Sequence, residues 1–180
     1  AVVRARCTEE VRQVVEICLR HRTPVVARGA GTGLSGGANA STAAWCSPLS
    51  HVGDPCDQSV GTVGGGPAGR GQRDLRAAVA EHGLWYPPDP PASSPWSTLG
   101  GNVATNAGGV CCVKYGVTGE YVLELEVVTG SAEVIRIGAR TAKGVAGYDL
   151  VSLLVGSEGT LASSPRSPSG SAACPPHPSR

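Results

Sequence analysis

Three glycine-rich segments contain the residue types of this sequence that could do chemistry. They are residues 28–33 (R-G-A-G-T-G), residues 100–109 (G-G-N-V-A-T-N-A-G-G) and residues 156–160 (G-S-E-G-T). Glycine lets the backbone approach a ligand closely, and successive N–H groups in such loops can bind an anion. A single loop of this kind is more often a structural turn than a binding site. Three of them, with Asn and Thr interleaved, favour a site for a large phosphate-bearing cofactor.

The first segment does not satisfy the fingerprint of a dinucleotide-binding fold. Gly29, Gly31 and Gly33 are spaced as G-x-G-x-G, but no complete G-x-G-x-x-G opens a helix here. A strand–helix–strand unit with a ribose-binding acid about 20 residues further on is also not visible. The sequence therefore argues against a nicotinamide-binding domain of that type.

No residue is predicted to act as a catalytic acid or base, or as a metal ligand. The four histidines lie outside the glycine-rich segments, and His82 is expected to be a packing or surface residue on a helix. Apart from the adjacent Cys111 and Cys112, the seven cysteines are scattered, which fits neither a zinc site nor a disulfide framework. We expect reduced thiols in a cytoplasmic protein that binds no metal.

Length and charge restrict the class of protein. A chain of 180 residues forms one domain of ordinary size or two small lobes that share a ligand. The formal net charge of +1 argues against nucleic acid or an anionic membrane as the main partner. No uninterrupted apolar stretch approaches the ~18 residues of a membrane span. Methionine is absent, so we expect a piece of a longer chain or a processed product.

A helix and a strand are predicted directly before the first glycine-rich segment. Thr8 is the expected N-cap of the helix. Apolar residues then recur at helical spacing along one face, at Val11, Val14, Val15 and Cys18. Pro24 ends the helical pattern, and residues 24–27 form the predicted strand that leads into the glycines.

A second helix and a β-hairpin are predicted further along the chain. The helix is expected to begin with Asp74 as N-cap and to end at Gly83. Residues 121–128 alternate, which predicts a strand with Leu125 and Val127 toward the core and Glu126 toward solvent. Residues 134–137 are its predicted hairpin partner.

Two stretches have no pattern that predicts an element. Residues 38–73 lack strand alternation and helical spacing, and so long a structureless stretch is unusual inside a compact domain. The tail from Ala162 is mostly Ser, Pro and Ala, and it is predicted to be disordered.

Five motifs occur in order along the chain: V-V-A-R-G-A-G-T-G-L-S-G-G, Y-P-P-D-P, T-L-G-G-N-V-A-T-N-A-G-G, K-Y-G-V-T and G-Y-D-L-V-S-L-L-V-G-S-E-G-T-L. Together they resemble the FAD-binding domain of the FAD-linked oxidase family, the vanillyl-alcohol oxidase type. The branch of glycolate oxidase flavoprotein subunits, D-lactate dehydrogenases and D-2-hydroxy-acid dehydrogenases is the most similar. The resemblance covers residues 8–40 and 74–161. It implies an α+β fold, a PCMH-type FAD-binding domain of two small α/β lobes with FAD between them, over residues 1–161.

The resemblance also implies which residues bind FAD. The first loop would wrap the pyrophosphate, through Arg28, Gly29, Ala30, Gly31, Thr32 and Gly33. The preceding segment of the second loop would approach the cofactor through Asp89, Ser97 and Thr98. The ribityl and flavin part would lie along Gly101, Asn102, Thr105, Asn106, Ala107 and Gly108. The adenine side would be closed by Glu158, Gly159 and Thr160. Taken alone, Asn102 and Asn106 are equally plausible as turn residues.

FAD is expected to be bound without a covalent link. Some members of the family attach FAD through a histidine in the first loop, and here Thr32 stands at that position. The histidines of this chain lie outside the cofactor motifs. The resemblance therefore implies non-covalent FAD.

Two departures from the family accompany the resemblance. Residues 41–73 and 162–180 do not match its pattern, and either a reading-frame slip in the gene sequence or genuine divergence would produce such breaks. The substrate-binding cap domain, which follows the FAD-binding domain in this family, is expected to be absent from the chain.

The implied function is the flavin half of an oxidoreductase. Its substrate would be a 2-hydroxy acid of the glycolate or D-lactate type, oxidised to the 2-oxo acid, with an electron-acceptor subunit or protein as a possible partner. One alternative is a sister activity on the same scaffold, such as an ether-lipid synthase or a sugar-lactone oxidase. Another alternative is a remnant that neither folds nor binds FAD.

Overall fold

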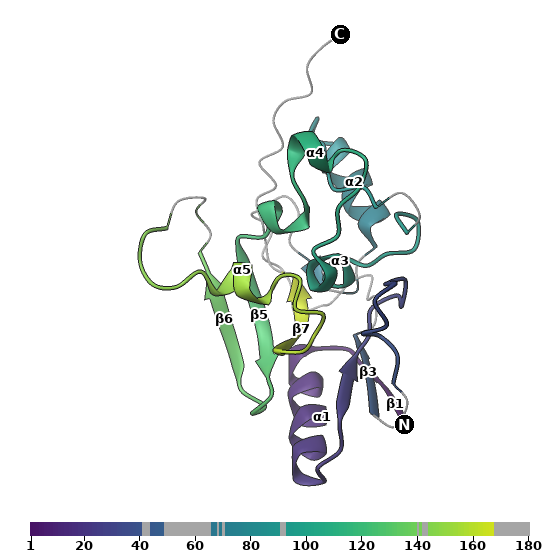
Figure 1. The fold of residues 1–180 in the computed structure, drawn as a ribbon, viewed down its shortest axis with the longest axis vertical. Coiled ribbons are helices and arrows are strands. Elements are labelled where there is room, and N and C mark those ends of the chain that lie inside the picture. Colours follow the sequence, from purple (N-terminus) through teal and green to yellow (C-terminus); the bar gives the residue numbers. More distant parts are fainter. Residues whose placement is uncertain are drawn as a thin grey trace.

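The computed structural model of the chain describes residues 1–40, 44–48, 66–67, 69, 71–90, 93–139, 141 and 144–167. These residues form two β-sheets with helices packed against them (Figure 1). A parallel sheet has the strand order β1-β3-β2, with the bounds β1 Val2–Ala5, β2 Val25–Ala27 and β3 Ala44–Pro48. An antiparallel sheet has the order β4-β7-β5-β6, with the bounds β4 Gly66–Pro67, β5 Glu124–Thr129, β6 Val134–Gly138 and β7 Ala162–Ser167. The α+β class is as predicted.

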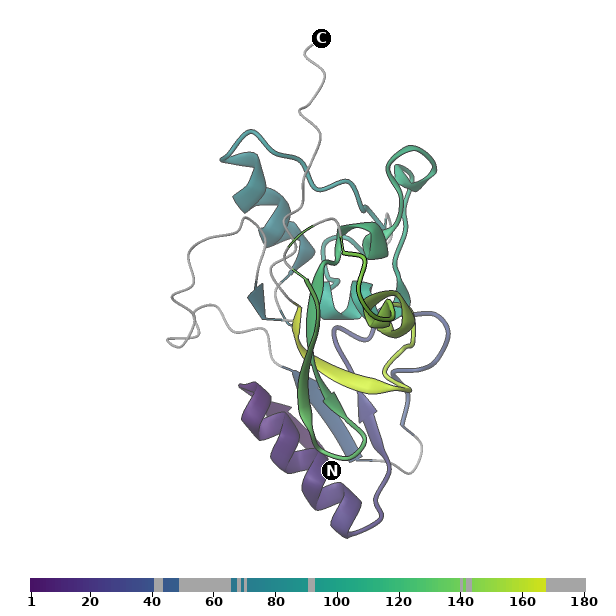
Figure 2. The same cartoon turned by 90° about the vertical axis from the view of Figure 1, so that its left-hand side faces the viewer.

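Helix α1 (Thr8–Arg20) packs where the two sheets meet. Its apolar face is the predicted one: Val11 and Val15 are buried against Ala5 of β1 and Val128 of β5. Both views place this helix at one end of the molecule, with α2 and α4 at the other (Figures 1 and 2). Burial of one helical face against both sheets thus connects the two parts of the fold.

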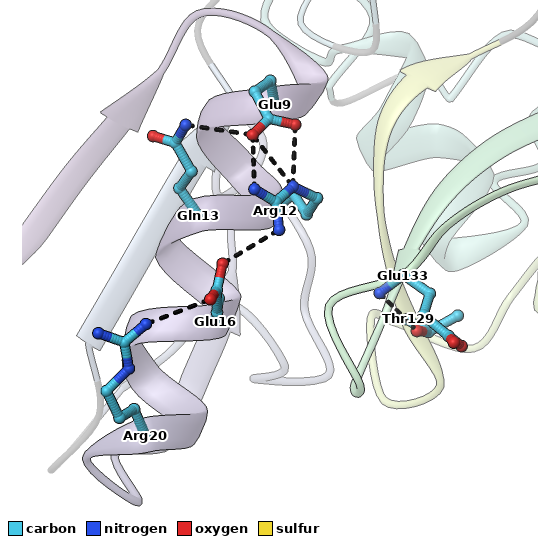
Figure 3. Close-up of polar contacts among 7 residues, drawn as sticks. All are labelled: Glu9, Arg12, Gln13, Glu16, Arg20, Thr129 and Glu133. Carbon is cyan, nitrogen blue, oxygen red and sulfur yellow. Dashed lines mark hydrogen bonds and ion pairs between the residues drawn. The ribbon is translucent and has the colours of Figure 1, made fainter.

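The exposed face of α1 carries a run of ion pairs. Arg12 bridges Glu9, at 2.7 Å, and Glu16, at 3.0 Å, and Glu16 also pairs with Arg20 at 3.2 Å (Figure 3). The hydrogen bonds from Arg12 lower the pKa of the Glu9 carboxyl below its usual value. Exposed pairs of this kind contribute little to stability, so the buried face accounts for most of the helix's stabilisation.

The sequence predicts Thr8 as the N-cap of α1, but in the structure the N-cap is Cys7. Thr8 lies in the first turn, and its hydroxyl donates to Glu126 Oε1 of β5 at 2.5 Å. Arg136 of β6 donates to the other oxygen of Glu126 at 2.9 Å. The prediction of a solvent-facing Glu126 is wrong: the residue is 8% exposed, because α1 covers this face of β5. The hydrogen bonds from Thr8 and Arg136 offset the free-energy cost of burying the Glu126 carboxylate.

The predicted hairpin is confirmed as β5 and β6, with Leu125 opposite Ile137. The turn between them is held by a hydrogen bond from the Glu133 N–H to Thr129 Oγ1 at 3.2 Å (Figure 3). The other face of β5 is apolar as predicted, since Leu125 and Val127 are buried. Helices α3 (Leu99–Thr105) and α5 (Leu150–Leu154) cover that face.

Helix α2 (Gln72–Ala80), the short helix α4 (Cys112–Tyr115) and the 3-10 helix η1 (Thr118–Tyr121) lie at the far end of the molecule. The N-cap of α2 is Gly71, three residues before the predicted Asp74. Leu75 and Val79 form a buried cluster with Tyr86 and Leu99, which fastens α2 to α3. Gly83 has a φ of +70°, the left-handed conformation that a glycine after a helix adopts readily.

Three strands lie in the stretches for which the sequence predicts no element. β3 is the central strand of the parallel sheet, and β4 is a short edge strand. β7 overturns the prediction of disorder from Ala162 as far as Ser167, and residues 168–180 lie outside the described part of the chain. The pairing of β5 with β7 changes register between Glu126 and Val128, where a β-bulge interrupts the ladder.

Candidate cofactor site

The first and second glycine-rich segments face each other across a groove with a volume of about 670 Å³. This volume lies within the ~300–1,000 Å³ of typical cofactor and ligand sites. One wall is the loop that follows β2, and the other is α3 with the residues after it. The groove is thus enclosed by segments that are about 70 residues apart in sequence.

The first loop approaches α3 closely because its glycines have no side chain. A Cβ atom on Gly29 would lie 2.6 Å from Thr98 Oγ1, at the start of α3. Gly31 has a φ of +75°, and a Cβ atom there would lie 2.5 Å from the Arg28 guanidinium. Both positions require glycine, so the loop presents main-chain atoms to the groove.

The second segment is a helix over Leu99–Thr105, where the sequence predicts a loop. Thr98 caps it, because its Oγ1 accepts a hydrogen bond from the Gly101 N–H at 3.2 Å. Leu99 and Val103, four residues apart, anchor the helix in the core and outweigh the poor helix propensity of the glycines. Asn106 ends the helix in the left-handed conformation with a φ of +48°.

The third segment is hydrogen-bonded to the last turn of α3. The N–H groups of Gly156 and Glu158 donate to the carbonyl oxygens of Val103 and Ala104, at 2.9 and 2.8 Å. Glu158 has a φ of +52°, and its carboxylate lies within 2.7 Å of the Cβ position of Gly37. Glu158 is the one ionisable side chain among the described residues that line the groove.

Most of the predicted site residues line this groove: Gly29, Ala30, Gly31, Thr32, Gly33, Thr98, Gly101, Asn102, Thr105, Asn106, Ala107, Gly108 and Glu158. A smaller adjoining cavity of about 70 Å³ is lined partly by Arg28 and Gly159. The remaining three, Asp89, Ser97 and Thr160, are absent from the described lining of both cavities.

The side chains of several predicted residues bond to other groups of the protein. Asp89 pairs with Arg76 at 3.0 Å. Thr160 Oγ1 donates to the Ser157 carbonyl at 2.7 Å. Asn106 Oδ1 accepts from the Gly119 N–H at 2.8 Å. Asn106 therefore shapes the groove as a turn residue, the alternative that its residue type alone leaves open.

The sequence also missed residues of the groove and its support. The first loop extends beyond Gly33 and adds Leu34, Ser35, Gly37 and Ala38 to the lining. The glycine pair at positions 36 and 37 is the signal that could have extended it. Gln72, which is fully buried beneath α3, gave no signal, because its partners are brought together by the fold alone.

The chemistry of the lining suits a large, neutral or anionic organic group. The described part of the chain contains no cluster of His, Cys, Asp and Glu that could hold a metal ion. Small side chains and main-chain atoms dominate the groove. Backbone N–H groups of a glycine-rich loop can bind a pyrophosphate, and close backbone approach allows a planar ring system to lie against α3.

Residues 1–138 match a family of proteins described as "FAD binding domain". The chain belongs to this family, and FAD is its cofactor. None of the helices in the described part of the chain is long and apolar enough to cross a membrane.

Curated relatives share 40% or more of the aligned residues. The chain is 44% identical over 163 residues to "Glycolate oxidase subunit GlcD" of Bacillus subtilis, a match that covers 89% of the chain and 34% of the relative. It is 40% identical to "D-lactate dehydrogenase" of Anaerostipes hadrus, over 89% of the chain and 34% of the relative. It is 41% identical to "D-2-hydroxyglutarate dehydrogenase" of Xanthomonas citri pv. viticola, over 85% of the chain and 32% of the relative. The chain thus spans about a third of the length of these relatives.

Solved structures confirm the fold. An alkyldihydroxyacetonephosphate synthase matches with a TM-score of 0.71 at 20% identity, over 94% of the chain and 30% of its own length. The 6-hydroxy-D-nicotine oxidase of Arthrobacter nicotinovorans matches with a TM-score of 0.71 at 17% identity, over 92% of the chain and 34% of its own length. The predicted PCMH-type fold is thereby confirmed.

Proposed function

We propose that the chain is the FAD-binding portion of an oxidoreductase that converts a 2-hydroxy acid, of the glycolate or D-lactate type, into the 2-oxo acid. The observation that carries this proposal is the identity of 40–44% to relatives named for glycolate, D-lactate and D-2-hydroxyglutarate. Each of these compounds carries a hydroxyl on the carbon next to a carboxylate. The shared chemistry is the removal of two electrons from that carbon.

The groove between the first loop and α3 is the proposed place of FAD. The main-chain N–H groups of residues 29–33 would bind the pyrophosphate. Thr105, with the residues that follow it, would contact the ribityl and flavin part, and Glu158, Gly159 and Thr160 would lie on the adenine side. When bound, FAD supplies the redox chemistry by accepting a hydride from the substrate carbon. The residues of this chain bind and orient the cofactor, and no acid or base for the substrate proton is assigned among them.

The proposal includes non-covalent FAD and a second protein as electron acceptor. Thr32, in the groove wall, has no nucleophilic nitrogen that could bond to the flavin. The Bacillus subtilis relative is named a subunit, which supports a multi-protein enzyme that includes this chain. We also place the protein in the cytoplasm, because Cys7, Cys18, Cys111 and Cys112 are all free thiols.

The sister activities are less well supported. The ether-lipid synthase among the solved structures is 20% identical to the chain, which is half the identity to the 2-hydroxy-acid enzymes. The remaining alternative is a remnant that does not bind FAD. Measuring whether flavin is bound distinguishes it from the proposal.

A chimera tests whether the chain can serve as the FAD-binding portion of such an oxidoreductase. The chain would replace the matched third of the Archaeoglobus fulgidus D-lactate dehydrogenase, to which it is 41% identical. We expect the purified chimera to contain flavin and to reduce an artificial dye with D-lactate. A matched chimera carrying Gly33→Val in the loop is the control, and it should lose flavin and activity together. A folded chimera without flavin would support the remnant and contradict the proposal.

A further inference from the structure

A buried side-chain amide beneath the groove connects two of the chain segments that form it. Gln72, the first residue of α2, is 0% exposed and is not among the described residues of the groove lining. Its Nε2 donates to the Pro88 carbonyl oxygen at 2.6 Å. Its Oε1 accepts from Asn102 Nδ2 at 2.5 Å and from Ser97 Oγ at 3.2 Å. One side chain therefore joins the segment around Pro88 to the stretch from Ser97 to Asn102.

The backbone around Gln72 strengthens the same connection. The Gln72 N–H donates to the Ser97 carbonyl at 3.1 Å, and Gly71 forms an isolated β-bridge with Thr98. Thr98 is the residue that caps α3. The start of α2 is therefore fixed to the start of α3 through both backbone and side-chain hydrogen bonds.

Each segment held by Gln72 leads directly into the groove wall. Pro90 follows Pro88 by two residues, Thr98 follows Ser97, and Asn102 belongs to the wall itself. We infer that Gln72 is a positioning residue for the cofactor: its amide, placed between Pro88, Ser97 and Asn102, fixes α3 at the distance from the first loop that FAD requires. This inference rests on the proposed placement of FAD in the groove.

The physical reason lies in the cost of unpaired buried polar groups. Without the Gln72 amide, the Pro88 carbonyl loses its side-chain donor and Asn102 Nδ2 keeps only the longer contact to Ser97, at 3.4 Å. Buried polar groups that lose a partner relax toward water or toward other partners. For Asn102, the nearest solvent is in the groove, so its relaxation would occupy space that the cofactor needs.

The first variant is Gln72→Met, which keeps the length of the side chain and removes the amide. We expect the affinity for added FAD to fall about tenfold, the change that corresponds to one buried hydrogen-bond partner. The matched control is Val15→Ala, which opens a cavity in the separate core under α1. We expect Val15→Ala to lower the thermal midpoint but to bind FAD as the unmodified chain does, at a temperature where circular dichroism shows both to be folded.

The second variant, Gln72→Glu, gives a readout that a purely structural role would not produce. A carboxyl group keeps the acceptors for Asn102 and Ser97, but it can donate to the Pro88 carbonyl only when protonated. Burial raises the pKa of a carboxyl group, so the proton is retained at low pH and is lost as the pH rises through that raised pKa. We expect this variant to bind FAD almost as tightly as the unmodified chain at low pH, and to lose affinity at high pH.

The outcomes separate this inference from the function on which it rests. If the unmodified chain binds no FAD, the proposed function fails and the inference fails with it. If the unmodified chain binds FAD and Gln72→Met binds it equally well, the inference alone is wrong. It is also wrong if Val15→Ala weakens FAD binding as much as Gln72→Met does. Failure of both Gln72 variants to fold at either pH would make Gln72 a stability residue and overturn its positioning role.

Discussion

Gly33 is a suitable position for adding a side chain to the groove without straining the backbone. Its φ lies outside the left-handed region, and a Cβ atom there would lie 3.8 Å from Thr105 Cγ2 on the opposite wall. Gly31 is a poorer probe, because its φ of +75° strains any substitution. A side chain added at Gly33 therefore enters the space between the loop and α3.

We expect Gly33→Val to weaken FAD binding by at least tenfold, equivalent to ~1.4 kcal/mol, because the added methyl groups occupy the cofactor's place. Gly130→Val is the matched control, since Gly130 has nothing within 4 Å of its Cβ position. The measurement is a titration of each variant with FAD, followed by flavin fluorescence. Equal affinity in the two variants would contradict the assignment of the first loop.

Thr32 stands at the position where a covalent link to FAD would form. Its side chain has a hydroxyl and no nitrogen that could bond covalently to the flavin ring. Acid denaturation should therefore release all FAD from the chain. After precipitation with acid and centrifugation, the yellow colour should remain in the supernatant. A yellow protein pellet would contradict non-covalent binding.

The side chains show what the sequence could and could not predict about the site. The glycines of the first loop are recognisable because close backbone approach allows few other residues. The roles of Asn106 and Gln72 could not be predicted, because their partners, Gly119 and Pro88, are brought to them by tertiary structure. A polar residue in a linear pattern does not reveal whether its partner will be a ligand or the protein itself.

Helix α5 carries a pH-dependent cap. Asp149 Oδ2 accepts from the Ser152 hydroxyl at 2.6 Å, and Oδ1 accepts from the Ser152 N–H at 2.9 Å. These bonds lower the pKa of Asp149 below its usual value. A carboxyl with a lowered pKa in the folded state stabilises the fold above its unfolded pKa of ~3.9, and this contribution is lost as the pH falls through the folded pKa.

We therefore expect Asp149→Asn to be less stable than the unmodified chain at pH 7, with the difference shrinking below about pH 4. Asparagine still caps a helix N-terminus, so the helix itself should persist. Asp149→Ala, which removes the cap altogether, should be the less stable of the two variants at pH 7. Urea unfolding at several pH values measures these differences. A difference between Asp149→Asn and the unmodified chain that does not change with pH would contradict the account.

Elements were predictable where their pattern is local. The apolar faces of α1 and α2 follow helical spacing, and β5 with β6 follows strand alternation across a short turn. β1, β3, β4 and β7 were missed because they are held by pairing with distant strands. Their sequences carry little alternation of their own. The buried Glu126 was missed for the same reason, since α1 covers its face of the strand.

At the scale of the whole molecule, FAD binding and turnover are separable properties. The groove contains one ionisable side chain, Glu158, among its described residues. Correct orientation of reactants is worth ~7–11 kcal/mol of a reaction barrier. We therefore expect that binding FAD is not by itself sufficient for turnover.

We expect the 180-residue chain, loaded with FAD, to show no measurable dye reduction with glycolate or D-lactate. The comparison is the chimera with the Archaeoglobus fulgidus enzyme, which should be active under the same conditions. Dye reduction by the chain alone at a rate near that of the chimera would mean that a complete active site lies within these residues.

FAD is proposed to lie between the first glycine-rich loop and α3. Hydrogen–deuterium exchange, measured by mass spectrometry with and without FAD, is the decisive test of this placement. We expect FAD to slow exchange in residues 28–38 and 98–108, and to leave residues 8–20 and 130–138 unchanged. Slower exchange confined to other residues, or no change under saturating FAD, would show that FAD does not bind in this groove.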